Sequence, residues 1–159
     1  MSRADRLLHL EVVTPARQVL EADVEAVILP ALDGYVGILP GHAPMIVGLD
    51  IGLVHYGGQS GPKQVMAVAG GFAEVRDDQV KVLADTAELA REIDVPRAKA
   101  AFARAEERLR HPSRDLDLAR AEAALRRAAV RLEVAGRAGG GGGAREGGYA
   151  PGEERLGEP

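Results

Sequence analysis

The spacing of apolar residues changes once along this 159-residue chain, near residue 84. Before that point, apolar and polar residues alternate in short runs, as they do in half-buried β-strands. Four such runs are 8–13, 23–29, 65–69 and 79–83. Turn-forming pairs, among them Asp33-Gly34 and Gly57-Gly58, lie between the runs. Short strands separated by regular turns predict an antiparallel β-sandwich over residues 1–87.

Beyond a transition segment at 84–92, apolar residues recur at spacings of three and four, which predicts helices. Asp94 is the expected N-cap of the first helix, with Pro96 in its first turn, and residues 111–113 end it. Its apolar stripe is Ala98, Ala101, Ala105 and Leu109.

A second helix follows, capped by Asp115 or Asp117 and ended by Gly136. Its stripe is Leu118, Ala121, Leu125, Ala128 and Leu132. The short link predicts an antiparallel hairpin over 88–135. Because Ala-rich stripes bury little area, this hairpin is expected to be marginally stable and able to move. Ten of the chain's 20 glycines fall in 136–159, which predicts a disordered tail. The expected fold class is therefore α+β in two parts, with this tail.

Composition excludes several function classes. A net charge of −4 argues against non-specific nucleic-acid binding, and the absence of cysteine removes thiol chemistry. No phosphate-binding loop, serine nucleophile elbow or histidine pair at metal-ligand spacing is present. No apolar run reaches the roughly 20 residues of a membrane span. A soluble protein without intrinsic catalysis is expected, which contacts membrane only through a partner.

The segment from Pro30 to Pro44, with Asp33-Gly34 and Gly37-Ile38-Leu39-Pro40-Gly41-His42-Ala43-Pro44, resembles the signature loop of ATP synthase epsilon subunits. Three further segments agree in order: 12–15, 70–75 and 93–98. The resemblance covers residues 7–134 and leaves the Gly-rich tail outside.

This resemblance implies a rotor subunit of the central stalk of the F-type ATP synthase, which couples proton flow to ATP synthesis without catalytic residues. It implies contacts with the gamma subunit and the membrane ring, and a peripheral position on the cytoplasmic face of the bacterial cell membrane. Gly34, Tyr35 and His42 are the candidate ring-facing residues, displayed on a rigid loop. Relatives often carry an acidic residue at the position of Tyr35, so a ring contact there would differ in chemistry.

The resemblance also implies a candidate ATP site in the hairpin, since Ile93-Asp94-x-x-Arg97-Ala98 matches a motif associated with ATP binding in some bacterial epsilon subunits. The remaining ligands in those relatives map onto Glu88, Arg104, Arg127 and Arg131. Spacing alone places Arg97 and Arg104 on one helix face, and Arg127 and Arg131 on another. Clustered guanidinium groups repel one another unless an anion lies among them, and a triphosphate offers many acceptor oxygens. No cofactor is required; ATP is the expected regulatory ligand.

Two other interpretations of the arginines remain open. They could pair with Glu106, Glu122 or Asp117 or face solvent, or they could dock on an acidic segment of the catalytic beta subunit when the hairpin extends towards alpha and beta. At the level of the whole protein, the alternatives are a stand-alone nucleotide-sensing module and a plain adaptor without ATP binding. An enzymatic function has no motif to support it.

Overall fold

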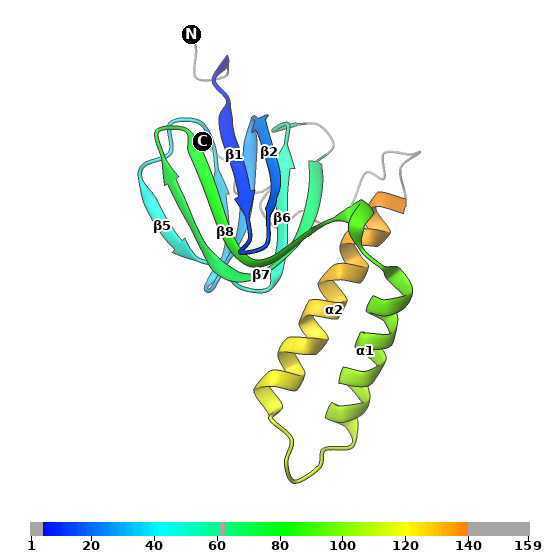
Figure 1. Ribbon diagram of the computed structural model, residues 1–159. Coiled ribbons are helices and arrows are strands. Elements are labelled where there is room, and N and C mark those ends of the chain that lie inside the picture. The colour runs from blue at the N-terminus through cyan, green and yellow to red at the C-terminus, as the bar shows by residue number, and fades with distance from the viewer. Residues whose placement is uncertain (1–4, 61–62, 140–159) are drawn as a thin grey trace.

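The computed structural model describes residues 5–60 and 63–139 as a strand-rich unit followed by a pair of helices (Figure 1). The strands are β1 (Leu8–Val13), β2 (Gln18–Val24), β3 (Ala26–Ala31), β4 (Gly34–Ile38), β5 (Met45–Gly48), β6 (Gly52–Gly57), β7 (Lys63–Arg76) and β8 (Gln79–Leu89). A 3-10 turn at Ala90–Glu92 leads into α1 (Val95–Arg110) and α2 (Leu118–Gly139). The predicted fold class, a sandwich followed by a two-helix hairpin, is confirmed. The sandwich is antiparallel as predicted except between β1 and β8, which pair in parallel.

The two long strands β7 and β8 join the layers of the sandwich. The strand order is β2-β1-β8-β7-β6-β3-β4, and β5 pairs with β7 off this path. The first half of β7 pairs with β6, whereas its second half pairs with β5. Gly70 and Gly71 lie between these halves with φ of 68° and 95°, a region that residues with side chains rarely adopt. This pair of glycines lets β7 pass from one layer to the other.

The main core fills the space between the layers. Leu8, Leu10 and Val12 of β1 are fully buried there, because alternate residues of a strand point to the same face. On β6 and β7, Val54, Met66 and Val68 point into the same core. The alternation seen in the sequence therefore marks the inner face of the sandwich.

A second apolar cluster lies on the outer face of the sandwich, under the hairpin. Leu53, Val65 and Ala67 of β6 and β7 pack there with Ala98 of α1 and Val134 of α2. Strand β6 is consequently buried on both faces from Gly52 to Tyr56. The far end of the hairpin projects beyond the sandwich, so only the later turns of α2 lie against the strands (Figure 1).

Several element boundaries differ from the sequence prediction. The run 23–29 spans the end of β2 and most of β3, with a break at Glu25, because a turn can interrupt an alternating pattern without a Gly or Pro. Strand β8 continues through the expected transition segment as far as Leu89, since its second half pairs with β7. The strands β4, β5 and β6 were not separately predicted.

The helix starts follow the predicted caps. Asp94 Oδ1 accepts from the backbone N–H of Arg97 at 3.1 Å, and Asp117 Oδ1 accepts from that of Arg120 at 3.1 Å. The expected end at Gly136 is wrong, because α2 continues to Gly139. Gly136 lacks the positive φ of a helix-ending glycine, so it lies inside the helix. The predicted tail from residue 140 on lies outside the described residues. No described helix is long and apolar enough to cross a membrane.

Candidate functional site

A cleft of about 280 Å³ lies where both helices meet β7 and β8. Its strand side is lined by Ala67, Val68, Ala69, Thr86 and Glu88, and its helix side by Ala101, Ala124, Arg127, Ala128, Val130 and Arg131. Most of these side chains are small, which leaves room between the helices and the sheet. The cleft thus has walls in both parts of the protein and exists in this form only while the hairpin is docked.

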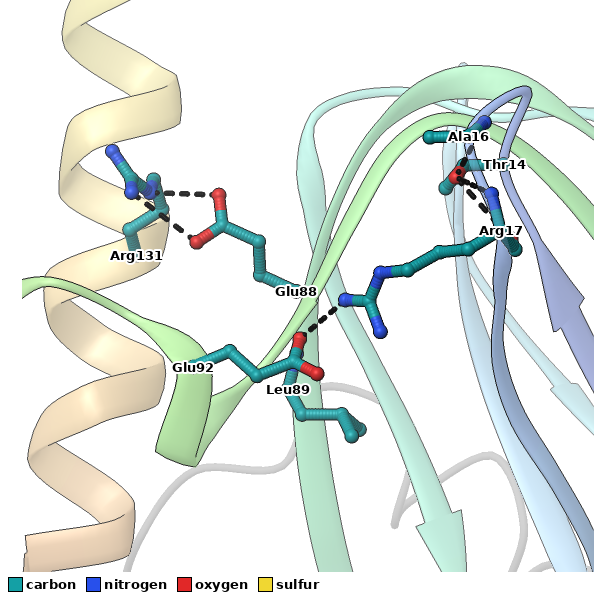
Figure 2. A network of polar contacts seen from close by, with 7 residues as sticks. All are labelled: Thr14, Ala16, Arg17, Glu88, Leu89, Glu92 and Arg131. Carbon is teal, nitrogen blue, oxygen red and sulfur yellow. Dashed lines mark hydrogen bonds and ion pairs between the residues drawn. The ribbon is translucent and has the colours of Figure 1, made fainter.

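Three predicted site residues meet at this cleft: Glu88, Arg127 and Arg131. Arg131 and Glu88 form a two-point ion pair between α2 and β8 (Figure 2). Arg131 Nε lies 3.1 Å from Glu88 Oε1, and Arg131 Nη2 donates to Oε2 at 3.2 Å. Arg127 lies one turn before Arg131, on the same helix face. Within 5–60 and 63–139, it makes no ion pair.

Arg97 and Arg104 lie on the face of α1 that carries Ala101. Ala101 lines the cleft, and it is four residues after Arg97 and three before Arg104, so the three share one helix face. Both arginines are exposed, and neither makes an ion pair with any residue that the structure describes. Of these three guanidinium groups without a carboxylate partner in the described chain, Arg127 lines the cleft, whereas Arg97 and Arg104 share a helix face with its lining residue Ala101. Such an arrangement favours an anion at this edge of the cleft.

The other three predicted residues have structural contacts in this conformation. Asp94 caps α1. Ile93 and Ala98 are buried in the apolar cluster between hairpin and sandwich, at 8% and 0% exposure. Their side chains support the walls of the site and do not line the cleft.

The carboxylates considered as alternative partners have other contacts. Glu106 pairs with Arg110 at 2.7 Å, and Asp117 caps α2. Glu122 is exposed on α2 and makes no ion pair with a described residue. Pairing within the hairpin therefore does not account for Arg97, Arg104 and Arg127.

The structure places the three candidate ring-facing residues in different settings. Gly34 opens β4 with φ of 128°, and His42 is partly buried in the loop after β4, with its Nδ1 2.7 Å from the carbonyl oxygen of Ala43. Tyr35 lies inside β4, and its hydroxyl oxygen accepts from the N–H of Leu53 at 3.3 Å. Its ring packs edge-on against the ring of His55, with 6.1 Å between the ring centroids. Burial raises the pKa of the Tyr35 hydroxyl, the largest effect on that group. The expected exposed position on a loop does not hold for Tyr35.

Sequence reasoning missed the strand wall of the cleft. Thr86 and the small residues at 67 and 69 lie on strands, so only the tertiary fold brings them to the helices. Nor did any sequence signal indicate that Glu92 pairs with Arg17 at 2.6 Å, because 75 positions separate the two residues (Figure 2).

Comparison with known proteins adds two family matches. Residues 7–90 match the ATP synthase delta/epsilon chain, beta-sandwich domain, and residues 91–136 match the long alpha-helix domain of the same family. Together they cover the sandwich, the 3-10 turn and nearly all of the hairpin.

Individual relatives agree. The ATP synthase epsilon chain of Pelotomaculum thermopropionicum is 50% identical over 106 residues, which cover 67% of this chain and 78% of the relative. That of Moorella thermoacetica is 52% identical over 103 residues, covering 65% and 77%. A chain in the cryo-EM structure of the Euglena gracilis mitochondrial ATP synthase, with OSCP, F1 and c-ring, superposes with a TM-score of 0.67 at 25% identity, covering 81% of each chain. On this sequence and structural agreement, the chain belongs to the delta/epsilon chain family of ATP synthases.

Proposed function

We propose that the protein is a non-catalytic rotor subunit of the F-type ATP synthase whose docked hairpin binds ATP and thereby regulates ATP hydrolysis by the complex. The observation that carries the ATP part is Arg127, which lines the cleft without a carboxylate partner in the described chain. Arg97 and Arg104 also lack such a partner there and share a face of α1 with Ala101, which lines the cleft. Guanidinium groups in such a setting recognise phosphate oxygens through paired, charge-assisted hydrogen bonds.

The size of the cleft limits what lies inside it. Small-molecule sites commonly measure about 300–1,000 Å³, so a cleft of about 280 Å³ would hold part of a nucleotide. The apolar alanine walls suit a base or sugar, whereas phosphates would lie over the exposed arginines of α1 and beside Arg127. Glu88 lies on the strand wall and offers an acceptor for ribose or adenine hydrogens, provided that one of its oxygens leaves Arg131.

Such a ligand would favour the docked hairpin. A ligand shifts a conformational equilibrium by the difference between its affinities for the two states. Because the cleft has walls on both sandwich and hairpin, ATP would bind the docked state better. Without ATP, the hairpin would leave the sandwich more often, and its arginines would become available to an acidic segment of the catalytic beta subunit.

The partners of the sandwich follow from family membership. We infer contacts with the gamma subunit and with the membrane ring, the latter near Gly34 at the start of β4 or near His42 in the loop after β4. The protein would then reach the membrane only as a peripheral part of the complex, on the cytoplasmic side of the bacterial cell membrane.

Isothermal titration of the full chain with ATP tests the nucleotide site. We expect saturable binding, and a dissociation constant about tenfold higher or more for Arg127→Ala, because one charge-assisted contact contributes about 1.5–3 kcal/mol. Arg120→Ala is the matched control, since Arg120 is also exposed on α2 but lies outside the cleft. No heat and no NMR shift change at millimolar ATP would exclude this site.

A second candidate role for the same arginines is docking on an acidic partner surface without ATP. Inhibition of the reconstituted ATPase, measured with and without residues 88–135, separates a regulatory hairpin from a plain adaptor. Co-purification with alpha, beta and gamma subunits separates a rotor subunit from a stand-alone nucleotide sensor.

A further inference from the structure

Two neighbouring arginines of α2 have different surroundings. Arg127 lines the cleft, whereas Arg126, about 100° further round the helix, faces the sandwich beside β6. Arg126 Nη2 lies 2.9 Å from Asp50 Oδ2 and 3.4 Å from the carbonyl oxygen of Ile51. Arg126 therefore contacts the sandwich at a point that does not line the cleft.

The backbone holds Asp50 in place for this contact. Asp50 Oδ1 accepts from the N–H of Ile51 at 2.8 Å, and the N–H of Asp50 donates to the carbonyl oxygen of Pro30 at 2.9 Å. The hydrogen bond from Arg126 is the largest of the effects that lower the pKa of Asp50. A fixed carboxylate loses little conformational freedom when it pairs, so more of the attraction contributes to docking.

On the other flank of α2, Arg131 pairs with Glu88 of β8. Between the two ion pairs, Leu53, Val65 and Val134 form the apolar contact of hairpin with sandwich. An apolar contact alone allows a helix to slide or roll, whereas an ion pair on each flank fixes its rotation. The rotation of α2 in turn decides whether Arg127 faces the cleft.

We propose that Arg126 and Asp50 form a clasp that holds the hairpin on the sandwich and so controls how much of the protein has the ligand cleft formed. Both are positioning residues, since neither lines the cleft. That the clasp regulates ligand binding rests on the proposed function, with ATP as the ligand. The apparent dissociation constant for ATP then varies inversely with the docked fraction, so it rises when that fraction falls.

Undocking can be measured without any ligand. The chain has no cysteine, so Val65→Cys places a single thiol, in a side chain of similar size, on the sandwich face that the hairpin covers. Val65 is 8% exposed, and the labelling rate of this thiol reports how often the hairpin opens, even when the open state is rare.

In this background we expect Asp50→Asn and Arg126→Gln each to raise the labelling rate about two- to fivefold, as for a moderately exposed ion pair. The double variant should label no faster than the faster single variant, because both changes remove the same contact. High salt should abolish the difference from the parent. Arg120→Gln is the matched control and should label at the parent rate.

Unchanged rates in both single variants would overturn the clasp, as would a double variant whose effect is the product of the two. Arg126 lies at an exposed helix position, so Arg126→Gln should fold normally. This variant remains informative if Asp50→Asn disturbs the turn that contains Asp50. ATP titration of the same variants without the reporter cysteine tests whether the clasp regulates ATP binding. If the wild-type chain fails to bind ATP, the proposed nucleotide site fails, whereas the labelling rates still decide the clasp.

Discussion

At the scale of single residues, the functional assignments that need only local geometry could be made from sequence. Asp94 is recognisable as a helix cap because the N–H from which it accepts, that of Arg97, is only three residues away. Tyr35 lies in a segment with the features of a loop, yet strand pairing places it in β4, against Pro30. That pairing is set by distant residues, so the position of Tyr35 could not be found from its neighbours.

Replacement of Asp94 by alanine should lower the free energy of unfolding by about 1 kcal/mol, because an N–H at the start of α1 loses its acceptor. Urea unfolding followed by circular dichroism measures the change. Asp94→Asn keeps a capping oxygen and should stay near the wild-type value. If Asp94→Ala is as stable as Asp94→Asn, the cap does not stabilise α1.

At the scale of elements, sequence periodicity located the sandwich core and both helices but misplaced several ends. Strand β8 reaches Leu89 since Thr86 to Leu89 pair with Ala69 to Met66 of β7, a partner invisible in the local pattern. Glycine was a poor signal for the ends of elements, since Gly70 and Gly71 lie inside β7. A glycine that ends a helix commonly has positive φ. Gly136 does not, and helix α2 passes through it.

Gly136→Ala should therefore stabilise α2 by up to about 1 kcal/mol, because alanine favours helix and an added Cβ meets nothing within 4 Å. Gly71→Ala should destabilise the sandwich by more than about 1 kcal/mol, since φ is 95° and a Cβ there would lie 2.0 Å from the carbonyl oxygen of Leu83. Thermal unfolding of both variants checks the opposite signs. A loss of stability in Gly136→Ala would contradict a regular helix at that position.

At the scale of the whole molecule, carboxylates hold together segments far apart in sequence. Asp78 Oδ1 accepts from the N–H of Gly41 at 2.6 Å, and its other oxygen pairs with Arg6. Asp50 pairs with Arg126, and Glu92 pairs with Arg17. The contact of Asp78 with Gly41 joins the turn between β7 and β8 to the loop after β4. The other two join the hairpin to the sandwich and the 3-10 turn to the segment before β2. The site was only partly predictable for a similar reason, because Thr86 and the small residues at 67 and 69 have no local feature that marks the helices they meet.

These contacts should make stability depend on acid. The pKa values of Asp78, Asp50 and Glu92 are lowered, chiefly by the hydrogen bonds from Gly41, Arg126 and Arg17 respectively. A lowered folded-state pKa contributes stability above the ordinary value of about 4, and this contribution is lost as pH falls through the folded-state pKa.

The free energy of unfolding should therefore fall as pH decreases below about 4. Urea unfolding across this range measures the slope, and Asp78→Asn should make it shallower. An identical slope in Asp78→Asn would show that the contact with Gly41 contributes nothing to acid sensitivity.

The burial of β6 on both faces has a consequence for the protein outside its complex. When the hairpin leaves, Leu53, Val65 and Ala67 become a contiguous apolar surface in water. Exposed apolar patches favour association with whatever covers them, including another copy of the same chain. A released hairpin therefore makes the free subunit prone to self-association at high concentration. Docking protects its solubility as well as shaping its cleft.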